Sequence, residues 1–178
     1  MTGVLMTKIS CRNTAAEAHR VLTMTPTLKE ITSYIHKNIP ITAHLGVQVT
    51  GYDGKSVTLS APLKPNLNHR MTAFGGSLSA VAILSGWALL HLLLKDKGLR
   101  CRLVIQKSSF EFSEPIDEDF EAVCSLPSDE HVEKFLRTLE RHKRARISIP
   151  SKISSASGKG GIHDGSYVAV ILNEKENV

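Results

Sequence analysis

The stretch from Asn66 to Leu94, NLNHRMTAFGGSLSAVAILSGWALLHLLL, is the most apolar part of the chain. From Met71 onward it contains no Asp, Glu, Lys or Arg. A helix that is apolar on every side belongs either in a membrane or in the interior of a protein. The fold depends on which of these two environments surrounds it.

The length of the stretch favours the protein interior. The uncharged run is long enough to cross a bilayer, but Gly75 and Gly76 interrupt it near its start. The helix that we expect, Ser77 to about Leu94, would be about 27 Å long at 1.5 Å per residue, which is marginal for a span. Strands predicted on both sides also need a helix to cover their apolar faces. We therefore predict a buried helix and no membrane span.

The residues before this helix predict a shorter helix and a β-hairpin. Thr27 and Glu30 have the spacing of a capping box, and Pro40 closes the helix that they begin. Two runs of alternating apolar and polar residues follow, from Leu45 to Thr50 and from Ser56 to Ala61. The Asp-Gly pair between the runs is a turn signal, so the two runs predict a hairpin with one buried face.

The residues after the long helix predict further strands. Alternating or apolar runs extend over Cys101 to Phe112, Phe120 to Leu126, Ala145 to Ile149 and Ser166 to Leu172. Ser128 is expected to cap a helix inserted among them. Residues 154–165 are rich in Ser and Gly and are expected to form a loop. Runs of antiparallel strands with one buried helix indicate an α+β domain.

The composition is that of a globular domain with a mild preference for anionic partners. Apolar residues make up 42% of the 178, which is too many for a disordered chain. The net charge of +5 favours a phosphorylated small molecule, RNA or an acidic carrier protein. Aromatic residues make up only 5%, which argues against stacking on nucleic-acid bases, so no nucleic-acid partner is expected.

The three cysteines, Cys11, Cys101 and Cys124, show no CxxC spacing and are typical of reduced thiols in a cytoplasmic protein. The histidines show no HxH or HExxH spacing, so we predict no metal site. We predict one domain, residues 27–174, preceded by a flexible N-terminal extension, residues 1–26, that contains no secretory signal.

Several segments resemble one bacterial family. The segments LKPNLNHRMTAFGGSLSAVAILSGW, IPITAHLGVQV, EFSEPIDEDFEA, FLRTLERHKRARISI and GSYVAVI together cover roughly residues 28–172. They resemble the putative thioesterase domain that occurs alone or fused behind an acetyltransferase-like domain. The resemblance implies the α+β hotdog fold, in which an antiparallel β-sheet is wrapped around a long central helix. It also implies hydrolysis of acyl-CoA or acyl-carrier-protein thioesters, with coenzyme A as part of the substrate, no separate cofactor, and a homodimer or tetramer.

The start of the long helix is where the resemblance places the chemistry. The first turn of a helix presents unpaired N–H groups, which can stabilise the oxyanion of thioester hydrolysis. Gly75 and Gly76 leave room for the substrate carbonyl, or else they only allow tight packing of the loop against the helix. Ser77 is expected to cap the helix or to donate its hydroxyl to the substrate.

Asn68 precedes Gly75 by seven residues, as an asparagine does in hotdog thioesterases of the phenylacetyl-CoA type. By that likeness it would orient the attacking water or the thioester. The alternative is a turn residue that bonds to its own loop, which is common for asparagine.

The chain departs from the pattern of those enzymes at two positions. Phe74 replaces the histidine before the glycines, and Ile83 replaces the acidic base on the helix. His69 is then the nearest titratable candidate for a general base, although a histidine in a loop is more often solvated.

Other side chains are candidates for holding water or for supplying a base. Thr72 and Ser77 are possible water-holding hydroxyls. In a dimer, the sheet of the second subunit is a further candidate source of the base, for example through Glu111 or Ser109.

Substrate binding is assigned to the residues beside the glycines and to basic residues elsewhere. Thr72, Phe74 and Gly75 would contact the thioester. Arg100, Arg102 and Arg144 would bind the phosphate groups of coenzyme A or of a phosphopantetheine carrier, although most runs of charge are solvated faces.

Two further functions remain open. The missing helix carboxylate is compatible with a non-catalytic acyl-CoA binder or regulator. The fusion of relatives to acetyltransferase-like domains is compatible with an accessory role in fatty-acid synthesis.

Overall fold

Six antiparallel strands form one sheet in the computed structural model, which describes residues 26–173. The strands lie in the order β1-β2-β4-β5-β6-β3. The predicted N-terminal extension, residues 1–26, lies outside the described residues except for Pro26. Along the chain the elements are α1 (Leu28–Asn38), α2 (Ile41–His44), β1 (Gln48–Tyr52), β2 (Ser56–Ala61), the 3-10 helix η1 (Lys64–Asn66), α3 (Gly75–Asp96), β3 (Cys101–Phe112), β4 (Phe120–Ser125), α4 (Asp129–His142), β5 (Arg144–Ser155) and β6 (Gly160–Ile171).

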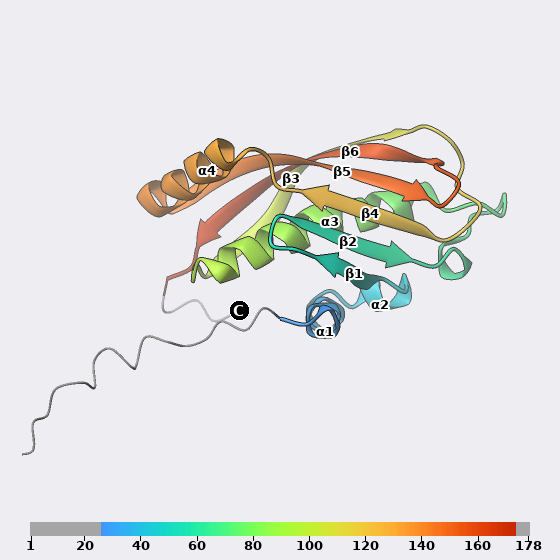
Figure 1. The fold of residues 1–178 in the computed structure, drawn as a ribbon, viewed down its shortest axis with the longest axis horizontal. Coiled ribbons are helices and arrows are strands. Elements are labelled where there is room, and N and C mark those ends of the chain that lie inside the picture. The colour runs from blue at the N-terminus through green and yellow to red at the C-terminus, as the bar shows by residue number, and fades with distance from the viewer. Residues whose placement is uncertain (1–25, 174–178) are drawn as a thin grey trace, which may run out of the picture.

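The long helix α3 lies against one face of this sheet (Figure 1). It begins two residues before the predicted start, at Gly75, and 13 of its 22 residues are buried. By length and composition α3 resembles a membrane span, yet 72% of its most apolar 18-residue window is buried inside the protein. It is therefore the core helix of the sheet, as the sequence predicts.

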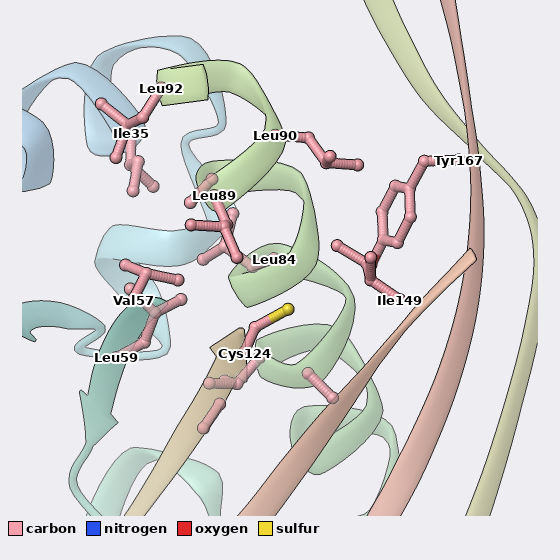
Figure 2. Packing of buried hydrophobic residues seen from close by; sticks show 14 of the residues in the cluster. Ile35, Val57, Leu59, Leu84, Leu89, Leu90, Leu92, Cys124, Ile149 and Tyr167 are labelled. Atoms are coloured by element: carbon pink, nitrogen blue, oxygen red, sulfur yellow. The ribbon is translucent and has the colours of Figure 1, made fainter. Parts of the chain in front are cut away.

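Leucines on two sides of α3 fill the core. Figure 2 shows Leu84 and Leu89 on the side of β2, where Val57 lies, and Leu90 on the side of Tyr167 in β6. Burial of a side chain of this size is worth about 1.5–3 kcal/mol relative to exposure. These two sides of the helix need no polar residues, because both meet apolar strands.

One stripe of α3 is left uncovered by the chain's own sheet. Ser79, Ala80, Ile83, Trp87 and His91 are only half buried. From Ala80 they recur every three or four residues, and Ser79 lies four residues before Ile83, so all five share one side of the helix. The expectation of a fully buried helix holds except along this stripe, because a single six-stranded sheet does not surround the whole circumference.

Strand β3 forms one edge of the sheet and pairs only with β6. Its side chains include two exposed apolar residues, Val104 at 47% and Phe112 at 56%. Unpaired backbone groups along an edge strand are a template for pairing with another chain.

The prediction of a loop over residues 154–165 is wrong for most of its length. Strand β5 continues to Ser155, and β6 begins at Gly160. A Cβ atom on Gly160 or Gly161 would collide with the backbone of a neighbouring strand. These glycines therefore permit a close approach of strands and do not mark a flexible loop.

The predicted capping box at the start of α1 is confirmed, whereas the predicted cap of α4 is confirmed only in its position. The Thr27 side chain accepts a hydrogen bond from the Glu30 N–H, and the Glu30 carboxylate accepts one from the Thr27 N–H at 2.7 Å. Ser128 occupies the N-cap position of α4, but its hydroxyl bonds to His131 Nδ1 at 2.7 Å and caps no backbone N–H.

Candidate active site at the start of the long helix

Helix α3 begins without a side-chain cap. Phe74 is the N-cap residue, and its carbonyl accepts from the N–H groups of Ser77 at 2.9 Å and Leu78 at 3.1 Å. The prediction that Ser77 caps the helix is therefore wrong, because the helix has already started at Gly75. Ser77 itself is largely buried, with 7% of its surface exposed.

The N–H groups of Gly75 and Gly76 have no acceptor among residues 26–173. Gly75 is half buried and Gly76 is exposed, so neither faces the closed core. The helix dipole adds a positive partial charge at this end. The structure thus presents two free donors at a surface that a ligand oxygen can reach.

Aromatic rings surround the two glycines. A Cβ atom on Gly76 would collide with the ring of Phe74, and one on Gly75 would lie 3.2 Å from Phe112 Cζ. The ring of Phe112 packs against Phe110, with 4.2 Å between ring centroids. The rings form an apolar wall beside the two N–H groups, and Phe74 and Phe112 are each 56% exposed.

Asn68 and Thr72 belong to a tight hairpin, residues 66–74, that leads into α3. The Asn68 amide donates to Thr72 Oγ1 at 2.9 Å, and its Oδ1 accepts from the Arg70 N–H at 2.7 Å. Both ends of the Asn68 side chain are thus bonded within its own hairpin. Its predicted role in orienting water stays a prediction that requires these bonds to open.

Asn66, which the sequence analysis did not single out, fixes the base of this hairpin. It is 1% exposed, and its side-chain amide donates to the carbonyls of Leu45 at 2.9 Å and Pro62 at 2.7 Å. Its own carbonyl accepts from the Phe74 N–H at 2.7 Å. No local pattern signals this role, because Leu45 is distant in sequence.

His69 lies near the tip of the hairpin and is exposed. It has no hydrogen bond or ion pair among the described residues. The structure leaves its imidazole open to a ligand but shows no interaction that joins it to Gly75 or Gly76.

Helix α3 carries no carboxylate before Asp96. Ile83, at the position expected for the acidic base, is half buried, and its carbonyl accepts from the Tyr167 hydroxyl at 2.8 Å. Asp96 accepts from the Tyr52 hydroxyl at 3.1 Å, at the other end of the helix. Within residues 26–173, no three His, Cys, Asp or Glu side chains gather as a metal-binding group.

The register of β3 separates the predicted Ser109 and Glu111 from the glycines. Phe110 and Phe112 point to the side of α3, so Ser109 and Glu111, which alternate with them, point to the opposite face. Ser108 shares the α3 side, and its hydroxyl lies 2.9 Å from His163 Nε2.

The pair of Ser108 and His163 was missed from the sequence. His163 is fully buried, its Nδ1 has no partner among the described residues, and burial lowers its pKa. Ser108 is four residues from Phe112, about 13 Å along the strand. Within one chain the pair is therefore too far from Gly75 to act on the same carbonyl.

The predicted basic residues lie at the other end of α3. Arg100 and Arg102 line a cavity of about 550 Å³ together with Lys95. Lys95 is twenty residues after Gly75 on the helix, about 30 Å away. Arg144 is exposed on β5 and lies across β6 from Arg102. The predicted substrate-binding residues therefore form two separate groups within one chain.

Known proteins share this arrangement. Residues 28–171 match a family described as Putative thioesterase (yiiD_Cterm). A protein of unknown function from Chlorobaculum tepidum TLS is 27% identical, with a TM-score of 0.77 over 81% of this chain and 94% of that chain. A putative thioesterase from Shewanella oneidensis is 22% identical, with a TM-score of 0.72 over 80% and 96%. A thioesterase from Haemophilus influenzae is 13% identical, with a TM-score of 0.67 over 86% and 97%. The six-stranded sheet and its central helix are those of hotdog-fold neighbours, so the predicted fold class is confirmed.

Proposed function

The chain belongs to the putative thioesterase (yiiD_Cterm) family, and from this premise we propose that it hydrolyses acyl thioesters of coenzyme A or of an acyl-carrier protein. One observation carries the choice of site. The N–H groups of Gly75 and Gly76 have no acceptor among the described residues, at the accessible start of the core helix. Family membership also confirms the resemblance drawn from the sequence.

The proposed chemistry uses these donors as an oxyanion hole. Attack of water on the thioester carbon moves negative charge onto the carbonyl oxygen, which the two fixed N–H groups stabilise without reorganisation. His69 takes the proton from the attacking water. The C–S bond then breaks, the sulfur takes up that proton, and a carboxylic acid and a thiol are released.

We further propose that the protein acts as a homodimer joined along β3. The exposed Val104 and the unpaired edge of β3 support this pairing. The half-buried stripe of α3, which includes Ile83 and Trp87, would then be covered, and the acyl chain would lie along it between the subunits.

Proline substitutions test the donors one at a time. Proline lacks an N–H group and is tolerated in the first turn of a helix. It suits position 75 well, because Phe74 already has the extended backbone (φ −68°, ψ 128°) that a residue before proline prefers. Gly75→Ala is the matched control, since it adds a Cβ near Phe112 but keeps the donor. Gly76→Pro and Gly76→Ala form the second pair; both add a Cβ that displaces the exposed Phe74 ring, so only the difference between the two variants isolates the donor.

The assay is release of free thiol from a panel of acyl-CoAs, followed with a thiol-reactive dye. Loss of one oxyanion donor is expected to lower kcat by about 10²–10³-fold relative to the matched alanine variant, and Gly75→Ala should stay within a few-fold of the parent. His69→Ala should also abolish turnover, and His44→Ala, an exposed histidine on α2, should not. Full activity in both proline variants would contradict the proposed oxyanion hole.

A non-catalytic acyl-CoA binder is the second candidate. The observation that favours it is the absence of any carboxylate on α3 before Asp96. Tight binding of acyl-CoA without thiol release from any member of the panel would establish the binder and reject the enzyme.

A further inference from the structure

A crevice lies between helix α4 and the first half of strand β5. Strand β4 pairs with β5 only over Ser151–Ser155, so α4 lies where β4 would otherwise continue beside β5 (Figure 1). The cavity between α4 and β5 has a volume of about 530 Å³. We call it the α4–β5 crevice, and its lining includes His131, Lys134 and Thr138 of α4 and Arg146 and Ser148 of β5.

Free backbone groups border the crevice on the side of β5. The Lys143 carbonyl accepts from the Ile171 N–H, so every second residue from Lys143 directs its backbone groups toward β6. Arg146 and Ser148 fall between these residues, and their backbone groups therefore point to the α4 side. Their N–H groups have no acceptor among residues 26–173, because β4 does not reach them. Two N–H groups are thus available to a ligand in the crevice.

Basic side chains decide which charge the crevice favours. The carbonyls of Arg146 and Ser148 point the same way as their N–H groups, so the backbone alone favours neither sign. Lys134 and Arg146 both line the crevice, and its lining includes no Asp or Glu. Neither cation has an ion-pair partner in the described part of the chain. An anion in the crevice would therefore meet two uncompensated positive charges.

The acidic residues of α4 do not neutralise these charges. Asp129 pairs with Lys55 at 3.1 Å, and Glu133 pairs one turn further along the helix at 3.5 Å. Glu130 and Glu140 are exposed, do not line the crevice and form no ion pair with any described residue. The side of α4 that borders the crevice is therefore its basic side.

The donors at the crevice suit a phosphate group. The planar guanidinium of Arg146 can donate two parallel hydrogen bonds to phosphate oxygens, and the Lys134 ammonium adds a point charge. Backbone N–H groups bind phosphate oxygens in the same way as they bind other anions. His131 Nδ1 lies 2.7 Å from the Ser128 hydroxyl, which leaves Nε2 free.

We propose that the α4–β5 crevice binds a small phosphorylated ligand, with phosphate oxygens held by Lys134, Arg146 and the free N–H groups of Arg146 and Ser148. The volume of the crevice falls within the roughly 300–1,000 Å³ that ligand sites occupy. The binding site requires residues of one chain only, because α4 and β5 supply all of these groups.

The crevice is separate from the proposed active site and from the proposed dimer edge. Arg146 precedes Ile153 by seven residues, about 23 Å along β5. Ile153 lies in the same cross-strand row as Phe112, which lies beside Gly75. Strand β6 separates β5 from β3, so a second copy paired along β3 does not occupy the edge of β5 at α4. Binding in the crevice is therefore independent of the proposed hydrolysis.

Pyrophosphate is the probe for this site. The full-length protein is titrated with pyrophosphate in an isothermal calorimeter at low ionic strength, without divalent metals, and we expect one saturable site per chain. Citrate, a trianion without phosphorus, should bind at least about tenfold more weakly. ATP distinguishes the source of the phosphate group. Tighter binding of ATP than of pyrophosphate would assign the crevice to nucleotides, and equal binding would assign it to the phosphate groups alone; both results support the proposal.

Paired variants locate the bound phosphate. Lys134→Gln combined with Arg146→Gln should weaken pyrophosphate binding by at least about tenfold, because two charged donors are lost. Lys29→Gln combined with Lys152→Gln is the matched control, since it removes the same net charge from exposed positions outside the crevice. Thr138→Trp fills the crevice without changing its charge and should also abolish binding. Thermal unfolding of each variant verifies that it is folded.

Three outcomes would overturn the proposal. These are the absence of saturable binding of pyrophosphate, equal affinity for citrate and pyrophosphate, and equal affinity in the two double variants. Thiol release from acyl-CoA is measured in a separate assay. Failure of the proposed hydrolysis therefore leaves the binding result intact, and failure of pyrophosphate binding leaves the proposed hydrolysis intact.

Discussion

The contact between Gly86 and Tyr167 makes a sharp test of how α3 is placed against the sheet. Gly86 is a buried glycine in the middle of the helix, and Tyr167 is a fully buried residue of β6. A Cβ atom on Gly86 would collide with the Tyr167 hydroxyl and lie 2.7 Å from Cζ of its ring. Helix propensity alone predicts that Gly86→Ala stabilises the protein by about 1 kcal/mol. The packing predicts the opposite sign.

The expected magnitude follows from what the tyrosine would lose. Its ring has no free space, and its hydroxyl donates to the Ile83 carbonyl at 2.8 Å. Overpacking a core typically costs about 1–3 kcal/mol, and loss of the hydrogen bond adds about 0.5–1.5 kcal/mol. After subtraction of the helix gain, Gly86→Ala should destabilise the protein by about 1–3 kcal/mol. The same shift would move α3, and with it the position of Gly75.

Urea unfolding measures this, with Trp87 emission as the probe next to the substituted residue. Tyr167→Phe alone should cost about 1 kcal/mol, because only the hydrogen bond is lost. Gly86→Ala combined with Tyr167→Phe should lower the free energy of unfolding by less than the sum of the two single changes, since both remove the same hydrogen bond. Ser79→Ala, on the half-buried stripe, is the control and should change stability by less than about 0.5 kcal/mol. A stabilised Gly86→Ala variant would refute the close contact between helix and sheet.

Three further predictions concern protonation, thiol reactivity and assembly. Burial lowers the pKa of His163 below its usual 6.5, so the unfolded chain takes up the proton first as the pH falls. The midpoint of urea unfolding should therefore drop between pH 7.5 and 5.5, and His163→Gln should make this drop smaller. Burial raises the pKa of the Cys124 thiol to about 11. Iodoacetamide at pH 8 should therefore modify the half-buried Cys101 well before Cys124, as followed by peptide mass spectrometry. Equal rates of modification in the folded protein would contradict this. Val104→Lys places a charge on the edge of β3 and should convert the proposed dimer to a monomer in light scattering; an unchanged mass would place the interface elsewhere.

The parts of the fold that the sequence predicts well are those with local causes. The capping box of Thr27 and Glu30 needs only residues three apart, and the run after Gly76 needs only its own composition. The prediction of a loop at residues 154–165 was wrong because the structure there depends on residues distant in sequence. Glycine in a strand and glycine in a loop look alike in sequence, and only the position of the neighbouring strand shows that Gly160 and Gly161 allow a close approach.

In the candidate site, too, features with local causes could be predicted from the sequence and features that depend on strand pairing could not. The glycine pair was predictable, because a first helical turn always presents free N–H groups. The pairing of Ser108 with His163 was not, because β3 and β6 shift register between Ile105 and Lys107. A shift of one residue changes which side chains face α3, and alternation read from the sequence cannot reveal it.

The uncovered stripe of α3 connects the fold to the proposed assembly. Ile83, Trp87 and His91 are half exposed, yet the stripe they share carries no charge until Lys95. A helix face that stays in water normally carries charged or polar residues, so this composition calls for a cover that the chain's own sheet does not supply. The edge of β3 lies on the same side, because Trp87 bonds to the Leu103 carbonyl. A second copy paired along β3 is therefore the simplest cover, and the charge-free pattern of α3 then has two physical causes: the chain's own sheet on one side and a partner on the other.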